Sequence, residues 1–351
     1  MKKIKVGVIG CGTIAKQHIE AYQKSDRAEV VALADIVPKQ VAALAEEYGI
    51  DKTYSDYRRM LKDDSFSAVS ICVPNFLHGE VTVRALESGK HVLCEKPMAL
   101  NLRQAQKMAD AAGKSKKVLM LAMCRRFQAE SQVLKKIIDS GKLGGIYHAH
   151  VSLLSRRGIP GLGGWFTTKS KSGGGPLIDK SVHALDLTIW LMGNPEPVAV
   201  SAATYAKFGN KKDYTYLSMW GKPVPGGTFD VEDYVTALIR FKDDSTLTLE
   251  CSWAANVSEE TFFSVILGDQ AGARIEIGKG VKIAGRSDGY LTDTIPYYAA
   301  RDRFLEEVVH FLDCIHTGKK PIPSAEDGLR IQKIIDAVYR SGRLKREVRI
   351  K

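Results

Sequence analysis

The sequence predicts an α/β protein with a doubly wound parallel sheet first, followed by an α+β domain with a mostly antiparallel open sheet. Short, fully apolar runs alternate with amphipathic segments through residues 1–124, as in parallel strands covered by helices on both faces. A glycine-containing turn after the first apolar run supports this prediction. From residue 197 onward, strand-like runs follow one another with turn residues between them, which favours antiparallel pairing.

The first part of the chain contains five predicted strands and four predicted helices in alternation. The strands are expected at 6–9, 30–34, 68–73, 91–94 and 118–123, and the helices at 14–24, 38–48, 78–88 and 102–112. Gly49 and Gly89 directly follow two of these helices, where glycine commonly ends a helix. The alternation ends near Cys124, so we expect one domain over residues 1–124 and a second over residues 125–351.

The second part mixes helices with a series of strands. Helices are expected at 129–139, 178–192, 302–316 and 325–339, and strands at 146–154, 198–205, 234–241, 245–253, 261–267 and 273–277. A glycine-rich stretch covers residues 158–175 and contains Trp165 and Phe166. Because long irregular segments inside compact domains are usually functional or disordered, and these aromatic residues argue against disorder, a functional loop is expected.

Composition restricts the classes of partner. The 51 basic and 40 acidic residues give a formal net charge of +11, but the basic residues are spread along the chain, which disfavours nucleic-acid binding. No apolar stretch approaches the roughly 18 residues of a membrane span. The six cysteines form no C-x-x-C pair, and no signal peptide is recognisable, so a cytoplasmic protein with reduced thiols is expected.

A phosphate-binding turn is predicted at residues 10–15, where G-x-G-x-x-A follows the first strand and opens the first helix. Gly10 permits the tight turn, Gly12 lets the backbone approach a pyrophosphate, and Ala15 allows close packing of helix and strand. With Thr13 and Ile14, these residues begin the helix, whose first N–H groups can bind an anion. The alternative is a pair of ordinary turn glycines.

Asp35 favours NAD as the dinucleotide. It lies at the end of the second strand, about 20 residues past the turn, where a carboxylate can accept hydrogen bonds from ribose hydroxyls and repel a 2′-phosphate. Lys39 is close enough in sequence to compensate that repulsion, so NADP stays possible.

Cys94-Glu95-Lys96-Pro97 stands at the end of the strand at 91–94, where ligands of open parallel sheets bind. A lysine there can orient a substrate hydroxyl, although a lone lysine at a strand end is more often a surface residue. Other motifs in chain order are Val73-Pro74-Asn75 with His78, and 173–179 (GGGPLID) with His183 and Asp186.

Together with the turn at 10–15, these motifs resemble the glucose–fructose oxidoreductase and inositol dehydrogenase (Gfo/Idh/MocA) family over essentially the full chain. The resemblance implies a Rossmann domain and a second domain whose open sheet often takes part in oligomer contacts. It also implies a catalytic role for Lys96 and places Pro74, Asn75, His78, Glu95 and Lys96 near the cofactor. A homodimer or homotetramer is expected on the same grounds.

Asp179 and His183 are four residues apart in a predicted helix, so their side chains share one face. An imidazole that titrates near neutrality suits a general base, and Asp179 can bind a second hydroxyl or hold His183 in place. Three other interpretations remain: a metal site with Asp186, a helix cap at Asp179, and a core histidine. No metal is expected. Relatives usually carry an apolar residue and then glycine where this chain has Lys180 and Ser181, which leaves the substrate open.

Arg125 and Trp165 complete the expected substrate contacts, along with Lys96, Asp179 and His183. Arg125 follows the last strand of the first domain and is assigned by resemblance; a solvated arginine is the alternative. Trp165 can cover nicotinamide or the apolar face of a sugar, or it can simply anchor its loop.

The predicted function is hydride transfer between NAD and a secondary hydroxyl or ketone of a sugar, sugar derivative or inositol. Lys96 and His183 are expected to act at the reacting hydroxyl, with Asp179 in support. Two alternatives are a non-catalytic ligand or nucleotide sensor of the same fold and a redox-neutral glycosidase that uses NAD transiently.

Overall fold

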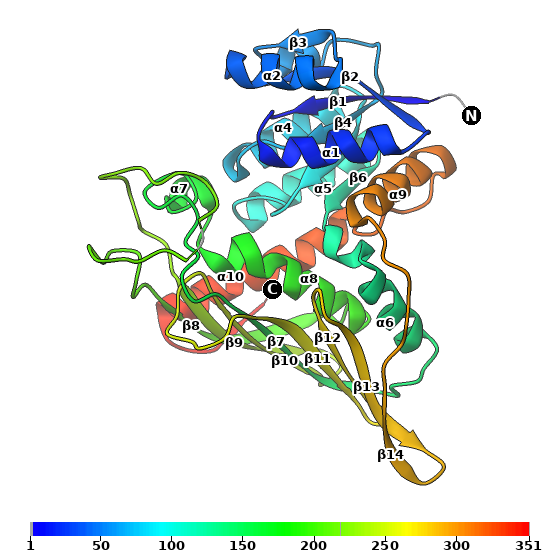
Figure 1. The fold of residues 1–351 in the computed structure, drawn as a ribbon, viewed down its shortest axis with the longest axis vertical. Coiled ribbons are helices and arrows are strands. Elements are labelled where there is room, and N and C mark those ends of the chain that lie inside the picture. The colour runs from blue at the N-terminus through cyan, green and yellow to red at the C-terminus, as the bar shows by residue number, and fades with distance from the viewer. Residues whose placement is uncertain (1–2, 218, 351) are drawn as a thin grey trace. The chain divides into compact units, whose positions relative to one another are not determined.

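A computed structural model describes residues 3–217 and 219–350, and its elements are labelled in Figure 1. The chain forms two compact units. The first combines Met1–Phe127 with Asp302–Leu329, and the second combines Gln128–Arg301 with Arg330–Lys351. The change of unit at residue 127 lies close to the expected domain boundary, but the return of residues 302–329 to the first unit was not expected from the sequence.

The first unit contains a six-stranded parallel sheet in the order β3-β2-β1-β4-β5-β6. This is the strand order of doubly wound dinucleotide-binding sheets, so the predicted fold class is confirmed. The strands are β1 (Ile4–Ile9), β2 (Ala28–Ala34), β3 (Lys52–Tyr54), β4 (Ala68–Ile71), β5 (His91–Glu95) and β6 (Leu119–Ala122).

Helices accompany the strands of this sheet, and three of them share two apolar clusters with it. The helices are α1 (Thr13–Lys24), α2 (Pro38–Tyr48), α3 (Tyr57–Met60), α4 (Asn75–Glu87), α5 (Leu102–Ser115) and α9 (Arg303–Thr317), with a 3-10 turn at Cys124–Phe127. Phe311 and Leu312 of α9 are buried in the same cluster as Tyr22 of α1, which explains why this late helix belongs to the first unit. A second cluster joins Val8 and Leu33 of the sheet to other residues of α1 and α2.

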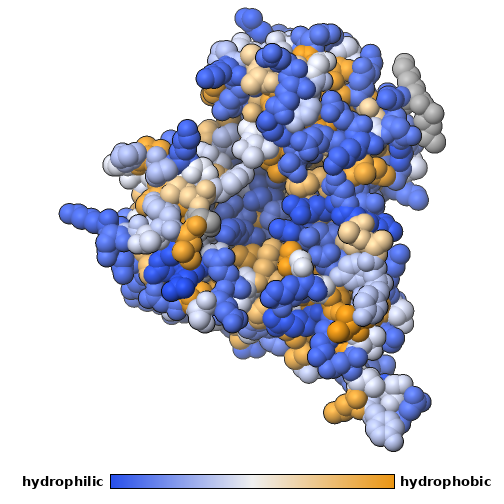
Figure 2. Space-filling view, in the orientation of Figure 1, coloured by the Kyte–Doolittle hydropathy of each residue, from blue (hydrophilic) through white to orange (hydrophobic). Residues whose placement is uncertain are grey.

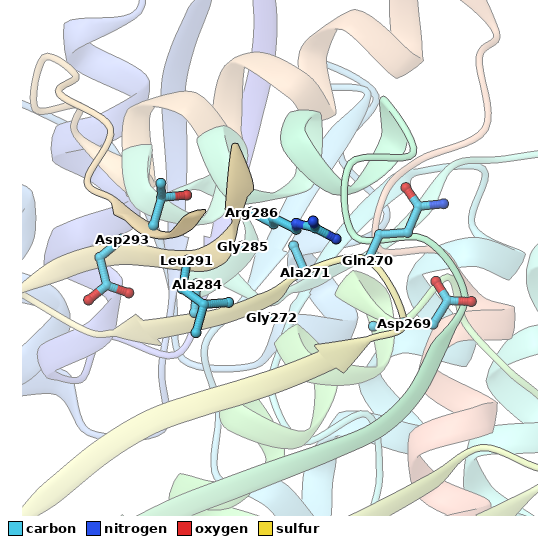
Figure 3. A pocket seen from close by; sticks show the side chains of 11 residues that line it. Asp269, Gln270, Ala271, Gly272, Ala284, Gly285, Arg286, Leu291 and Asp293 are labelled. Carbon is cyan, nitrogen blue, oxygen red and sulfur yellow. The ribbon is translucent and has the colours of Figure 1, made fainter. Parts of the chain in front are cut away.

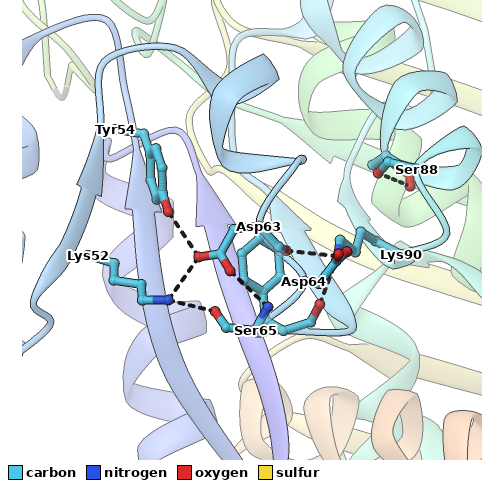
Figure 4. A network of polar contacts seen from close by, with 9 residues as sticks. Lys52, Tyr54, Asp63, Asp64, Ser65, Ser88 and Lys90 are labelled. Atoms are coloured by element: carbon cyan, nitrogen blue, oxygen red, sulfur yellow. Dashed lines mark hydrogen bonds and ion pairs between the residues drawn. The ribbon is translucent and has the colours of Figure 1, made fainter.

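A polar network fixes the turn that precedes β4 (Figure 4). Lys52 Nζ and Tyr54 Oη donate to the Asp63 carboxylate over 3.0 and 2.9 Å, and Lys90 Nζ donates to the Asp63 carbonyl over 2.9 Å. Hydrogen bonds from Ser65, followed by the bond from Lys52, hold the pKa of Asp63 well below its usual range. The turn therefore ties β3 to the approach of β4, whose far end leads to the Pro74–Asn75 segment.

The second unit contains a nine-stranded sheet in the order β14-β13-β12-β11-β7-β10-β9-β8-β15. Only β7 and β10 pair in parallel, so the predicted mostly antiparallel sheet is confirmed. The strands are β7 (Ile146–Leu154), β8 (Pro197–Tyr205), β9 (Tyr234–Phe241), β10 (Thr246–Ser252), β11 (Thr261–Gly268), β12 (Gly272–Glu276), β13 (Gly280–Ser287), β14 (Tyr290–Thr294) and β15 (Val348–Arg349).

The helices of this part are α6 (Ala129–Asp139), α7 (Lys169–Ser172), α8 (Val182–Leu191) and α10 (Ala325–Leu344), whose last residues return to the second unit. Nearly every residue of α8 is buried, because the helix packs against β7, β11 and α6. The expected helix at 178–192 starts differently, because Leu177–Ser181 forms a π-helical turn that continues into α8. Strands β3, β13, β14 and β15 were not predicted, since they are short or carry mixed polar and apolar residues.

The surface is polar over most of the face shown in Figure 2, with apolar residues in small separate groups. Within residues 3–217 and 219–350, no helix is long and apolar enough to cross a membrane. All six cysteines are buried and free of disulfides.

Candidate functional site

The glycine turn has the geometry that the sequence predicts. Gly10 has φ +95°, and a Cβ atom there would lie 2.5 Å from the carbonyl oxygen of Cys72, so only glycine fits. Gly12 is the N-cap of α1, and a Cβ there would meet no atom within 4 Å. Gly10 therefore allows β1 and β4 to approach, while Gly12 leaves open space at the amino end of the helix.

The first turn of α1 suits an anion. Thr13 is exposed, Ile14 is half-buried and Ala15 is fully buried in the cluster with Val8. No acidic residue lies in this turn, so the N–H groups and the positive end of the helix dipole face no competing negative charge from their own helix. The backbone and the open side of Gly12 fit the pyrophosphate of a dinucleotide.

Asp35 is held rigidly beside this turn. One carboxylate oxygen accepts from the backbone N–H of Cys11 over 2.7 Å, and the other accepts from Val37 N–H over 2.9 Å. A carboxylate has about four acceptor positions, so it can still accept hydrogen bonds from ribose hydroxyls. Burial, and then the charge of Asp35, raise the pKa of the Cys11 thiol to about 12, so this thiol stays protonated at neutral pH. Lys39 lies exposed at the start of α2.

The segment Pro74, Asn75 and His78 begins α4, with Pro74 as its N-cap. His78 is buried, and its Nδ1 and Nε2 atoms lie 2.6 Å from the carbonyl oxygen of Pro97 and 2.8 Å from that of Val73. Burial lowers the pKa of His78, and these two carbonyl oxygens act in the opposite direction. The ring thus joins the segment after β4 to the segment after β5.

Glu95 and Lys96 stand at the carboxyl end of β5. Glu95 is buried and its Oε1 lies 2.9 Å from His18 Nε2, whereas Lys96 is half-buried. Burial alone would raise the pKa of Glu95, but the hydrogen bond from His18, together with the positive charge of Lys96, outweighs it, so the pKa is lowered.

The predicted cofactor residues therefore follow the carboxyl ends of four strands of one parallel sheet, β1, β2, β4 and β5. Strand order reverses direction between β1 and β4, and such a switch point is where open α/β sheets bind ligands. The sequence predicts that these residues lie close together, because the carboxyl ends of parallel strands meet at one edge of the sheet.

Asp179 and His183 lie on successive turns, Asp179 in the π-helical turn and His183 at the start of α8. Trp253 Nε1 donates to Asp179 Oδ2 over 3.0 Å, and both side chains are buried. Trp253 was expected only to pack in the core. It does pack with Ile159 and Val231, but its indole N–H also fixes a predicted site residue.

The glycines before Asp179 are required by close packing. A Cβ on Gly174 would lie 1.9 Å from Tyr339 Oη, and one on Gly175 would lie 2.0 Å from the Glu232 carbonyl oxygen. The buried Glu232 carboxylate accepts hydrogen bonds from the Gly175 and Leu177 N–H groups and from Tyr339 Oη, at 3.0, 3.3 and 2.9 Å. Burial raises the pKa of Glu232. These contacts hold the start of the π-helical turn, and sequence reasoning did not find them.

Lys180 and Ser181, which depart from the usual family pattern, are accommodated within the second unit. Lys180 Nζ donates to Ser155 Oγ over 2.9 Å, just after β7, and Ser181 is fully buried. The lysine is therefore tied to a neighbouring loop.

The expected substrate residues Arg125 and Trp165 lie in separate units. Arg125 is half-buried in the turn after β6, while its neighbour Arg126 is buried and lies 3.5 Å from Asp327. Trp165 stacks on Phe166 with ring centroids 3.7 Å apart, and the rings of Phe166 and Trp220 meet in a T-shaped arrangement with centroids 5.4 Å apart. The loop at 158–175 thus carries a cluster of packed aromatic rings.

Two other features lie apart from these residues or concern their ability to bind a metal. Among the described residues, no group of three histidine, cysteine or carboxylate side chains is placed to hold a metal ion, including the set around Asp179. A cavity of about 560 Å³ in the second unit is lined by residues 268–272, 284–286 and 291–293 (Figure 3). None of the predicted site residues lines it.

Comparison with known proteins supports a dinucleotide-binding oxidoreductase fold. Residues 4–123 match the oxidoreductase family with an NAD-binding Rossmann fold, and residues 131–274 match the Gfo/Idh/MocA C-terminal domain. The chain is 36% identical to the D-glucoside 3-dehydrogenase of Escherichia coli K12, over 96% of this chain and 95% of that protein. It is 26% identical to the myo-inositol 2-dehydrogenase of Thermotoga maritima, over 99% of this chain and 98% of that protein.

Solved structures agree with these relatives. A levoglucosan dehydrogenase complexed with NADH and levoglucosan superposes with a TM-score of 0.87 at 25% identity, covering 99% of this chain and all of that one. Matches over both domains, together with a relative of this identity over nearly the full length, establish that the chain is an NAD-binding oxidoreductase of the Gfo/Idh/MocA family.

Proposed function

We propose that this NAD-dependent sugar dehydrogenase oxidises a secondary hydroxyl of a glucoside, with carbon 3 of the glucose ring as the reacting carbon. The observation that carries the choice of substrate is the 36% identity with a D-glucoside 3-dehydrogenase over nearly the full length of both proteins. Inositols are the second class of substrate, since the chain also aligns end to end with a myo-inositol 2-dehydrogenase. The sensor and redox-neutral glycosidase alternatives are not favoured by these relatives.

The first unit supplies the cofactor contacts. The turn from Gly10 to Ala15 binds the pyrophosphate, and the fixed carboxylate of Asp35 accepts the ribose hydroxyls. Pro74 and Asn75 line the same edge, whereas the polar atoms of His78 and Glu95 bind protein groups, so these two shape the edge indirectly. NAD held by these residues would supply the hydride acceptor for the carbon that carries the hydroxyl.

Three side chains handle the proton and the hydroxyls. Lys96 donates a hydrogen bond to the reacting oxygen and stabilises its developing negative charge. His183 accepts the hydroxyl proton as the C–H bond breaks, so the products are a ketone, NADH and a protonated base. Asp179, held by Trp253, accepts a hydrogen bond from a neighbouring hydroxyl and sets the orientation of the ring. Arg125 and Trp165 provide further substrate contacts.

The test is NADH formation with glucosides, free aldoses, levoglucosan and inositols, with the new carbonyl located by NMR. A 3-keto glucoside as the preferred product supports the proposal. Preferred turnover of an inositol, or a carbonyl at another carbon, would contradict the substrate assignment and leave the reaction class intact. The variant His183→Asn should bind NAD normally but lose most of its kcat, measured at saturating substrate and compared with the wild type.

A cytoplasmic homodimer or homotetramer is the expected form of the protein. Six buried free thiols suit a reducing compartment. The family resemblance implies that subunits associate through the open sheet of the second unit. Size-exclusion chromatography with light scattering measures the assembly directly, and a monomer at micromolar concentration would contradict it.

A further inference from the structure

A chain of buried hydrogen bonds crosses the first unit and ends at the backbone of Lys96. Tyr22 Oη lies 2.9 Å from Ser70 Oγ, Ser70 Oγ lies 3.1 Å from His18 Nδ1, and His18 Nε2 lies 2.9 Å from Glu95 Oε1. Glu95 Oε2 then accepts the Lys96 N–H over 3.1 Å. Tyr22, Ser70 and His18 are almost wholly inaccessible to water. The chain links α1, β4 and β5 to the first residue after the β5 strand.

The chemistry of these groups allows every contact to be a hydrogen bond with a neutral imidazole. The Glu95 carboxylate only accepts, so His18 Nε2 carries the proton that faces it. Nδ1 is then the acceptor of the neutral ring, and the Ser70 hydroxyl donates to it. Tyr22 Oη donates in turn to Ser70 Oγ. All donors point the same way, toward one buried carboxylate, and such chains reinforce themselves in a low-dielectric interior.

We propose that His18 is a positioning residue for Lys96, acting through the Glu95 carboxylate; this inference rests on the proposed role of Lys96 in sugar oxidation. The carboxylate has one oxygen on the imidazole and the other on the Lys96 N–H, so the ring fixes its rotation. That rotation fixes the backbone from which the Lys96 side chain begins. A buried carboxylate without its imidazole partner would turn toward another donor and release the Lys96 N–H.

Two isosteric variants separate positioning from simple support of the fold. In His18→Gln, the side-chain amide N–H reaches the place of Nε2 and restores the bond to Glu95, while the Ser70 link is lost. In His18→Asn, the amide oxygen takes the place of Nδ1 and keeps the Ser70 link, while Glu95 loses its donor. Each variant breaks one bond of the same chain, and His18→Asn should lower the melting temperature more, because the bond that it removes is to a charged group. Rates are therefore compared well below both melting temperatures.

The kinetic expectation is asymmetric. Because a displacement of about 1 Å can cost roughly 100-fold in rate, His18→Asn should lower kcat by about 10- to 100-fold. His18→Gln should keep kcat within about threefold of wild type, since its bond to Glu95 is intact. The KM for NAD should be unchanged in both, because the glycine turn and Asp35 are untouched. The variant Tyr22→Phe, which removes only the far end of the chain, is the matched control and should behave like His18→Gln.

A second readout needs no turnover. A second measurement is the rate at which an amine-reactive reagent labels the Lys96 ammonium group, quantified by mass spectrometry with the exposed Lys142 of the second unit as internal standard. The rate at Lys96 should change at least about threefold in His18→Asn and stay at the wild-type value in His18→Gln. If the wild type oxidises no sugar, the proposed function fails, and labelling still decides whether His18 sets Lys96. Equal effects of the two variants on labelling, or equal losses of kcat, would overturn the positioning role.

Discussion

Replacement of Trp253 by phenylalanine tests how the second unit holds Asp179. The indole N–H donates to Asp179 Oδ2 over 3.0 Å, and phenylalanine keeps an aromatic ring in the apolar cluster but has no donor. The substitution therefore removes a hydrogen bond to a buried carboxylate together with part of the packing volume.

The size of the effect follows from these two losses. A hydrogen bond to a charged group contributes about 1.5–3 kcal/mol. The smaller ring leaves a cavity that costs roughly a further 1–2 kcal/mol, because Trp253 is completely buried. The free energy of unfolding should fall by the sum of both terms. Of these two losses, the hydrogen bond is the one that orients Asp179, so kcat/KM for the sugar should fall by about 10- to 100-fold, at about 1.4 kcal/mol per factor of ten.

The assay combines urea unfolding with steady-state kinetics for Trp253→Phe, Asp179→Ala and the double variant. The double variant should lose hardly more kcat/KM than Asp179→Ala alone, since the carboxylate that the indole positions is already absent. Ile159→Val is the control within the same cluster, and it should cost about 0.5–1.5 kcal/mol of stability with kcat/KM unchanged. If Trp253→Phe loses stability but keeps kcat/KM, the indole only packs, and the argument for its role at Asp179 is refuted.

Three further predictions concern the first unit. Lys96→Ala should abolish most turnover while NAD binding, measured by fluorescence titration, is retained; unchanged turnover would contradict its assignment. Asp35→Ser removes the carboxylate beside the glycine turn, so the preference for NAD over NADP should fall by roughly 10- to 150-fold, the equivalent of about 1.5–3 kcal/mol, as the ratio of kcat/KM values. Burial, and then Lys117, lower the pKa of His91 from 6.5 to about 4, and its Nδ1 accepts the Val118 N–H over 3.1 Å. The unfolded chain therefore takes up a proton first as the pH falls, and stability should be lost between about pH 6.5 and pH 4. His91→Gln should flatten the pH dependence of the unfolding free energy in that window, and an unchanged slope would contradict the assignment.

The cofactor half of the site could be predicted because its signals are local. The turn at residues 10–15 is contiguous, and the apolar runs place Asp35 and Lys96 at strand ends. Parallel pairing then brings those ends to one edge, whatever the details of packing. The sequence could not assign residues 302–329 to the first unit, since an amphipathic helix shows that it has a partner but not which surface that partner presents.

The substrate half could be predicted only in part, because its geometry depends on contacts between distant segments. The Asp179–His183 spacing is local, and the motif gave it. The donor to Asp179 comes from Trp253, and the acceptor that holds the preceding glycines is Glu232. Glu232 precedes β9 and Trp253 follows β10, so their positions depend on how these strands pair in the second sheet. The periodicity of a single segment does not specify which indole or carboxylate will face the π-helical turn. From the sequence alone, these residues would be assigned to the core or to a loop.

His18 differs from these cases, since the sequence did carry a signal for it. Ala15, His18, Ile19 and Tyr22 follow the i, i+3, i+4, i+7 spacing of a buried helical stripe, and all four are buried in α1. A polar residue on such a stripe must find a buried partner, because burying an imidazole without a hydrogen bond destabilises the fold. The partner had to be polar and close to the sheet, and Glu95 at the end of β5 is such a group. A histidine in the apolar stripe of the first helix is therefore expected to pair with the glutamate that precedes the lysine. The difference in kcat between His18→Gln and His18→Asn tests what this pairing does for catalysis.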